Sequence, residues 1–242
     1  GWNVLDAERN EIAPPKWVKP LIYISIPWAI SIHTVTAFLY CGLPGRGFWL
    51  TAVLAPRFLA SAFAAGPAFL ILLAFIVRRV SNFDAGREPI QTLAKIVTYG
   101  AIANIFFFLC EVFVALYSQI PEHTAHLEYL FFGLHGHDVL VPWMWTSIFL
   151  MLAAIALLVI PSARRNEAVL GVACVAIFVG IWIDKGLGMI SGGFIPNPLH
   201  HVQEYVPTPP EIAITIAVYA TGFLVLTLLY KVVVGVKQEI GE

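Results

Sequence analysis

The sequence carries little charge. Only 12% of its 242 residues are Asp, Glu, Lys or Arg, whereas 59% are hydrophobic, and the formal net charge is −1. Ordinary soluble domains have about 25% charged and about 45–50% apolar residues. This deficit excludes a typical soluble domain and indicates that the chain is solvated by lipid. The nearly neutral balance gives no reason to expect a nucleic-acid partner.

Cysteine and intramembrane histidine are also scarce. Cys41, Cys110 and Cys174 stand alone in apolar stretches and form no CxxC or CxxCH pattern. The sequence therefore lacks a motif for an iron–sulfur cluster, covalent haem or structural zinc. Haem b between helices needs two axial ligands, and only His33 lies well inside a hydrophobic stretch. We expect no haem, iron–sulfur cluster, flavin or metal in this chain, so any electrons must come from a neighbouring protein.

The first residue is Gly1, and no charged segment with a small-residue cleavage site follows it. We therefore interpret residues 1–18 as a cytoplasmic segment and not as a signal peptide. We expect an N-terminal part of the natural polypeptide to precede it.

Six long hydrophobic stretches dominate the rest of the chain. A bilayer core about 30 Å thick requires about 20 apolar residues in a helix. The stretches are bounded by Pro, Gly or charged residues and are apolar on all sides, unlike the amphipathic helices of soluble proteins. We predict an all-α integral membrane protein with six transmembrane helices, at residues 19–43, 49–78, 93–119, 138–161, 167–190 and 211–234.

Basic residues are distributed unevenly between the two sides of these spans. The side holding both termini and the loops 79–92 and 162–166 has 11 of the 14 Lys and Arg residues. The positive-inside rule therefore places both termini of this chain in the cytoplasm, in a multi-pass protein of the cytoplasmic membrane. The opposite loops, 120–137 and 191–210, contain no Lys or Arg and hold six of the seven histidines. Loops of this kind either fold back on the protein or cover a partner.

Five ionisable side chains are predicted to lie in the outer half of the membrane: His33, Arg57, Glu111, Asp184 and Lys185. Ionisable groups are costly in lipid, so each is a candidate for proton transfer. Each also has a structural interpretation. For His33 it is packing through a hydrogen bond, and for Arg57 it is a pair with Glu111 that joins two helices. For Asp184 and Lys185 it is a salt bridge or a place at the headgroup interface.

The run from Ser25 to Pro67 resembles the polysulfide reductase membrane-anchor family of NrfD/PsrC type. It reads SIPWAISIHTVTAFLYCGLPGRGFWLTAVLAPRFLASAFAAGP, and the resemblance continues at 141–145, 194–198, 208–212 and 224–231. The resemblance implies about ten spans arranged as two four-helix bundles with extra helices, of which this chain holds the last six. By that reading, 19–43 closes the N-terminal quinone bundle and 49–190 forms the second bundle. An outer loop at 191–210 and a last helix with a cytoplasmic tail at 211–242 follow.

The same resemblance implies a quinone-interacting subunit of a respiratory complex, linked to dissimilatory sulfur or sulfite metabolism. It would exchange electrons between menaquinol and a ferredoxin-like iron–sulfur subunit on the periplasmic side, beside other membrane and cytochrome subunits. His33 and Tyr40 are then the quinone-binding candidates, and Glu111 paired with Arg57 is a route for protons. Two alternatives remain. A secondary transporter would place polar groups at the midplane and show internal repeats. A purely structural anchor would need none of these ionisable residues.

The basic asymmetry generates a topological prediction. A cysteine replacing Ser162 should react with a membrane-impermeant thiol reagent only from the cytoplasmic side, and one replacing Glu122 only from outside. Labelling of intact cells and of inverted vesicles measures the two accessibilities. If both cysteines react from the same side, the orientation is wrong.

Overall fold

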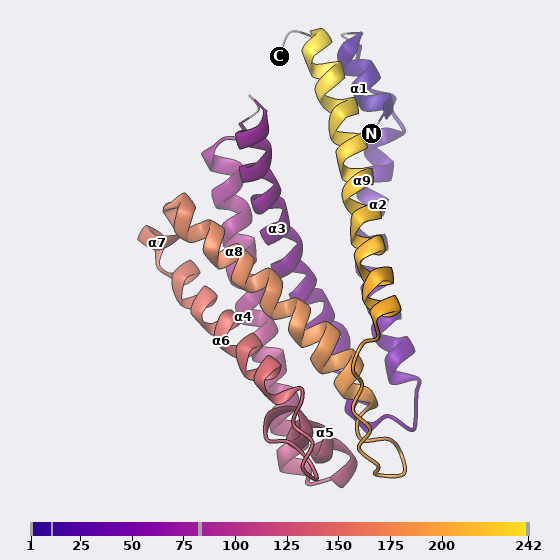
Figure 1. The fold of residues 1–242 in the computed structure, drawn as a ribbon. Helices are drawn as coiled ribbons and strands as arrows, with labels where there is room; N and C mark the ends of the chain where they lie inside the picture. Colours follow the sequence, from indigo (N-terminus) through magenta and orange to yellow (C-terminus); the bar gives the residue numbers. More distant parts are fainter. Residues whose placement is uncertain (1, 11, 82–83, 241–242) are drawn as a thin grey trace. The chain divides into compact units, whose positions relative to one another are not determined.

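The computed structural model describes residues 2–10, 12–81 and 84–240. Gly1 and part of the 79–92 loop therefore lie outside the described residues. The described chain is built mainly of helices, six of which are long and apolar enough to cross a membrane (Figure 1). The predicted all-α membrane fold is confirmed.

The six predicted spans correspond to helices. They are α2 (Val18–Cys41), α3 (Leu54–Val80), α4 (Arg87–Ser118), α6 (Val141–Val159), α8 (Glu167–Trp182) and α9 (Pro209–Ile240). The helix α3 begins at Leu54 and not at residue 49, because residues Gly47–Trp49 form the short 3-10 helix η1 with the Trp49 side chain fully buried. Pro56 then lies in the first turn of α3, where its missing N–H costs no helix hydrogen bond. The fifth span continues beyond α8 as the π-helix η2 (Ile183–Ser191) and the 3-10 helix η3 (Gly192–Phe194).

The chain divides into two compact units. The smaller unit comprises residues 1–30 and 205–242, and in it the short helix α1 (Trp2–Arg9) packs against α9. The larger unit comprises residues 31–204 and contains α3 to α8 with the second part of α2. All ionisable candidates from the sequence lie in the larger unit.

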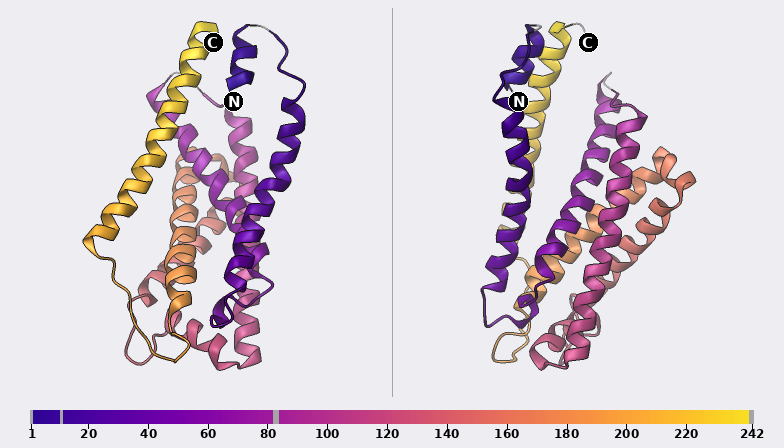
Figure 2. Two further views of the ribbon diagram at one scale, coloured as in Figure 1. Left: turned by 90° about the vertical axis from the view of Figure 1, so that its right-hand side faces the viewer. Right: turned by 180° about the vertical axis from the view of Figure 1, so that it is seen from behind.

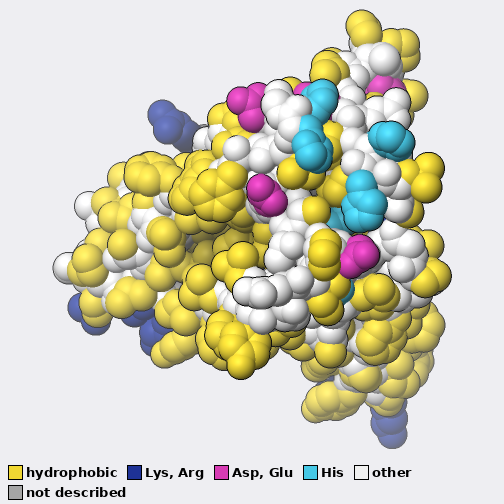
Figure 3. Space-filling model, turned by 90° about the horizontal axis from the view of Figure 1, so that it is seen from below, with side chains coloured by type: hydrophobic (Ala, Val, Ile, Leu, Met, Phe, Trp, Pro, Cys, Tyr) yellow, Lys and Arg dark blue, Asp and Glu magenta, His cyan; other side chains and the backbone are white. Residues whose placement is uncertain are grey.

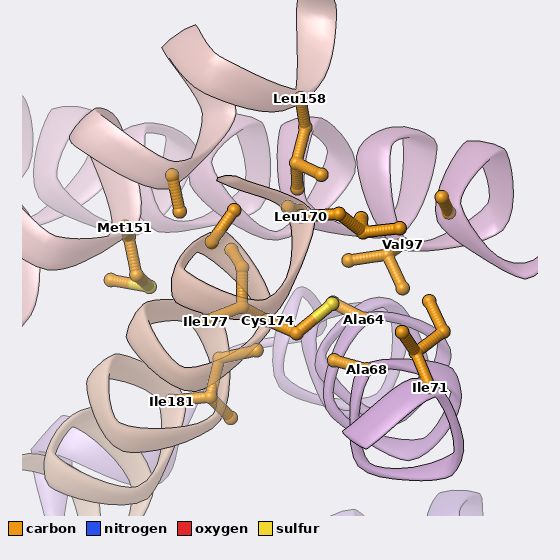
Figure 4. Close-up of a cluster of buried hydrophobic side chains, with 14 of the residues drawn as sticks. Ala64, Ala68, Ile71, Val97, Met151, Leu158, Leu170, Cys174, Ile177 and Ile181 are labelled. Atoms are coloured by element: carbon orange, nitrogen blue, oxygen red, sulfur yellow. The ribbon is translucent and has the colours of Figure 1, made fainter. Parts of the chain in front are cut away.

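In the larger unit α3, α4, α6 and α8 pack around one core. The helix α3 contacts α4 and α8, and α6 contacts α8 and α4 (Figure 2). The core consists of small and aliphatic side chains, including Ala64, Ala68, Ile71, Val97, Met151, Leu158, Leu170, Cys174, Ile177 and Ile181 (Figure 4). Small residues permit the close backbone approach that stabilises helix pairs in lipid, where water exclusion gives no gain.

The 120–137 segment contains a helix where the sequence indicated only a loop. This helix, α5 (Pro121–Phe131), begins with Pro at its first position and Glu122 in its first turn, both favourable at a helix N-terminus. It packs against α4, α6, η1 and η3, and the short α7 (Pro161–Arg165) joins α6 to α8 at the other end of the bundle.

Side chains tie the two histidine-rich segments together. The Nδ1 atom of His126 lies 2.5 Å from the carbonyl oxygen of Ile195. The carboxylate of Glu204 accepts a hydrogen bond from the Val139 N–H at 3.0 Å and lies 3.1 Å from Nδ1 of His137. Parts of both segments therefore fold back on the protein.

A close helix approach in the core generates a stability prediction. A Cβ atom on Gly100 of α4 would lie 2.9 Å from the backbone nitrogen of Ala64 on α3, so Gly100→Ala must push the helices apart. We expect a loss of about 1–3 kcal/mol of stability, the usual cost of overpacking. Gly66→Ala on α3 is the matched control, because a Cβ there meets no atom within 4 Å. Thermal unfolding in detergent measures both, and equal melting temperatures for the two variants would contradict the packing.

Candidate functional site

Arg57 is the centre of a buried ion cluster. It lies in the first turn of α3 with 3% of its surface exposed. Its guanidinium donates from Nη2 to Oδ1 of Asp184 at 2.6 Å, and from Nη1 to Oε2 of Glu111. One side chain therefore joins α3, α4 and η2. The predicted pairing of Arg57 with Glu111 is confirmed, and Asp184 is a second partner that the sequence did not reveal.

Lys185 completes the cluster. Its Nζ atom lies 3.4 Å from Oδ2 of Asp184 and 5.3 Å from the centre of the Phe58 ring. The Arg57 guanidinium similarly lies 5.0 Å from the centre of the Phe108 ring. Two cations thus face two carboxylates, with aromatic rings shielding the cations from lipid. Balanced charge and cation–π contacts offset part of the cost of desolvating four ionic groups.

Asp184 lies in the interior of the larger unit. Its predicted salt bridge is confirmed, and its side chain is 3% exposed. The π-helix that carries it is rich in glycine. A Cβ on Gly188 would lie 2.6 Å from Sδ of Met144, so glycine is what allows η2 to pack on α6. Short π-helical turns occur frequently at functional sites.

Several polar atoms of the cluster have no hydrogen-bond partner within the described part of the chain. They include Nε of Arg57, Oε1 of Glu111, Oδ2 of Asp184 and Nζ of Lys185. A cavity of about 10 Å³ lies among Arg57, Glu111 and Asp184, which is room for about one water molecule. Buried polar atoms are rarely left unsatisfied, so we expect a water molecule there.

Glu111 also lines a second cavity. This cavity has a volume of about 40 Å³, and its walls include Phe48, Thr51, His123 and Leu127. Phe48 and Leu127 line both cavities. The Glu111 carboxylate therefore stands between the ion cluster and the histidine-bearing helix α5.

The two quinone-binding candidates lie elsewhere. His33 is half-buried on α2 and is not among the residues lining the two cavities beside Glu111. The Tyr40 ring packs edge-on against Trp49, with 4.8 Å between centroids, and stacks on Phe58 at 6.2 Å. Trp49 in turn donates from Nε1 to the carbonyl oxygen of Met189 at 2.9 Å. The structure brings Tyr40 into an aromatic cluster beside η2, whereas it does not bring His33 to the cavities next to Glu111.

Sequence reasoning missed His123 and His126 as members of the site region. Both lie on α5, three residues apart, which places them on one side of that helix. Burial is the largest influence on His126 and lowers the pKa of its imidazole, so this ring stays neutral. Pro121 was the available indication, because it predicts a helix start, and two residues three apart lie on one face if the segment is helical.

The fold and the cluster define a multi-pass helical membrane protein with a charge-balanced ionic site inside its bundle. The chain belongs to the polysulphide reductase NrfD family, whose sequence model matches residues 7–194.

Two curated relatives are similar to this chain. A putative dimethyl sulfoxide reductase membrane subunit of Halobacterium salinarum is 27% identical, over 84% of this chain and 50% of the relative. A selenate reductase subunit of Mesobacillus selenatarsenatis is 22% identical, over 75% of this chain and 41% of that relative. The chain therefore spans half or less of the length of these proteins.

The ion cluster generates a stability prediction. Arg57→Ala should cost about 3–5 kcal/mol, because it leaves two buried carboxylates without their shared cation. Arg57→Lys should recover only part of this loss, since an ammonium group lacks the planar fork that reaches both carboxylates. Unfolding in detergent measures the changes.

Arg79→Ala is the control for these variants, because Arg79 lies on the same helix and is exposed. Exposed substitutions of this kind usually change stability by less than about 0.5 kcal/mol. A loss for Arg57→Ala no larger than that of Arg79→Ala would contradict the ionic cluster.

Proposed function

We propose that this chain belongs to the quinone-interacting membrane subunit of a reductase complex, which exchanges electrons between a quinol and an iron–sulfur partner. Membership of the NrfD family supports this, as do relatives named as subunits of a dimethyl sulfoxide reductase and a selenate reductase. The observation that carries the proposal is the buried cluster of Arg57, Glu111 and Asp184 beside water-sized cavities. A quinol releases two protons with its two electrons, so its oxidation requires groups that take protons away.

The finer identity rests on sequence resemblance. Within the family, the Ser25–Pro67 run resembles the P subunit of the sulfite-reduction-associated DsrMKJOP complex. We propose menaquinone as the quinone, a ferredoxin-like iron–sulfur subunit on the periplasmic side as the electron partner, and additional membrane and cytochrome subunits. In this proposal the chain has no haem, iron–sulfur cluster or metal of its own. Much of the quinone pocket would belong to a preceding N-terminal bundle that His33 and the rest of α2 close.

Glu111 is the proton-carrying group in this mechanism. Arg57 remains positively charged throughout, because a guanidinium does not lose its proton in proteins. When Glu111 takes up a proton, Arg57 keeps its second carboxylate partner, Asp184, which it shares with Lys185, so the cluster then carries one positive charge. When Glu111 releases the proton, its charge is again balanced by Arg57. The bridge thus lets one carboxylate change its charge without exposing an isolated ion to lipid.

The walls of the cavity of about 10 Å³ limit where protons can move. Phe108 and Met189 line this cavity beside the ion cluster, so its walls are apolar except for the charged side chains. Such walls exclude bulk water and confine proton movement to the carboxylates and to any enclosed water. Asp184 holds the guanidinium by accepting a hydrogen bond from Nη2, and the same carboxylate also pairs with Lys185.

The proposed function generates an activity prediction for the assembled complex. Glu111→Gln should slow quinol-coupled electron transfer by roughly tenfold or more, because an amide does not carry protons. His33→Ala should also slow it, if His33 contacts the quinone or accepts its first proton. Glu88→Gln on the same helix α4 is the control, since Glu88 is exposed. Quinol turnover and the assembly of the complex are measured together.

Arg57→Ala should slow turnover more than Glu111→Gln, because it leaves the buried carboxylates without their cation. The proposal fails if complexes with Glu111→Gln and with His33→Ala both assemble and both turn over quinol at the wild-type rate. These side chains would then be structural, as in a simple anchor.

A further inference from the structure

Glu111 needs a connection to water if it is to exchange protons, and two neighbouring cavities on the side of α5 offer a candidate route. The cavity of about 40 Å³ beside Glu111 is also lined by His123. At about 10–15 Å³ for each molecule, it has room for roughly three water molecules. Thr51 adds a hydroxyl group to the wall, and the other lining residues are apolar.

His123 lines a second, wider cavity on its other side. That cavity has a volume of about 380 Å³, and its polar walls include Glu122, His126, Asn197 and His200. Leu50 and His123 line both cavities, so this pair lies between the two spaces. Figure 3 shows the face of the protein where histidine and acidic side chains gather. Shared lining residues thus place three cavities in order: the one at the ion cluster, the one between Glu111 and His123, and this polar basin.

A wide apolar groove does not offer the same polar route. It has a volume of about 470 Å³ and lies between α4, α5 and α6, lined mainly by aromatic and aliphatic side chains. Glu111 and His123 are not among its lining residues, and its one carboxylate, Glu128, is exposed. Proton transfer requires a chain of polar groups or water, so this groove offers no path to the cluster.

We propose that His123 is the group through which Glu111 exchanges protons with the aqueous phase on the α5 side. A proton from quinol oxidation leaves the Glu111 carboxyl group through water in the cavity of about 40 Å³ and is taken up by one imidazole nitrogen of His123. The imidazole then releases a proton to water in the basin and returns to its neutral form. Only O–H and N–H bonds form and break, and the same steps run in reverse during quinone reduction. Histidine suits this role because imidazole gains and loses protons near neutral pH.

Two carboxylate residues share cavity walls with His123. Glu111 of α4 lines the cavity of about 40 Å³ with it, and Glu122 of α5 lines the basin with it. The neighbouring histidines in the basin are His126 on α5 and His200 in the segment after η3. Burial lowers the pKa of His126, and its Nδ1 faces backbone carbonyls, so it does not compete for the proton near neutral pH.

The inference rests on the proposed function, and its test uses the assembled complex in proteoliposomes with a pH-sensitive dye in the compartment that α5 faces. His123→Ala should slow both quinol turnover and the appearance of protons by about tenfold or more, and millimolar imidazole should restore both. His123→Gln, which keeps the size of the side chain, should be equally slow. His135→Asn is the control, because His135 is exposed and Asn tolerates its left-handed backbone at φ 53°.

The outcomes separate the two proposals. If imidazole restores quinol turnover and the appearance of protons in His123→Ala, proton exit through His123 is supported, because a purely structural loss would not respond to a small base. A slow variant that imidazole does not restore counts against it. Wild-type rates in both His123 variants, with Glu111→Gln still slow, overturn the exit and leave the proposed function standing. Wild-type rates in the Glu111 and His33 variants as well overturn both proposals.

Discussion

The forked bridge from Arg57 to two carboxylates is the interaction on which the larger unit depends. It joins the start of α3 to the later part of α4 and to η2, three elements that are distant in sequence. Lipid cannot solvate these charges, so separating the helices exposes ions to hydrocarbon, whereas the small-residue core gains little from the exclusion of water. Packing brings the helices together, and the bridge fixes their register. The same charges supply the titratable group that the proposed proton transfer requires.

Much of the architecture could be predicted from composition because a bilayer imposes simple rules. A run such as 211–234 has no stable alternative to a spanning helix when nearly every side chain is apolar, and the rarity of charge made Arg57 and Glu111 conspicuous partners. The sequence did not reveal that Asp184 is the second partner of Arg57, because this depends on the π-helical geometry of η2. It also did not reveal α5, whose short amphipathic stretch is stabilised by contacts with η1 and η3 and not by length.

The cavities were the least predictable part of the site. Both cavities beside Glu111 are lined by Phe48 from η1 and Leu127 from α5, which are distant in sequence, so no local pattern encodes them. His123 is one of six histidines in two segments without basic residues, and composition alone does not distinguish it from His135. Only the tertiary fold places one histidine in a cavity wall and another at the surface.

The π-helix η2 also restricts insertions and deletions in this part of the chain. A π-helix has more residues in each turn than an α-helix, so losing one residue here would allow the segment to become α-helical. Positions after the segment would keep nearly the same orientation, because the residue lost is the extra one of a π turn, whereas positions within the segment would shift. Gly188 and Gly192 now face Met144 and Leu130, where an added Cβ atom would lie 2.6 Å and 2.5 Å from the nearest side-chain atom. A change in the length of this segment therefore has to leave glycine at both contacts.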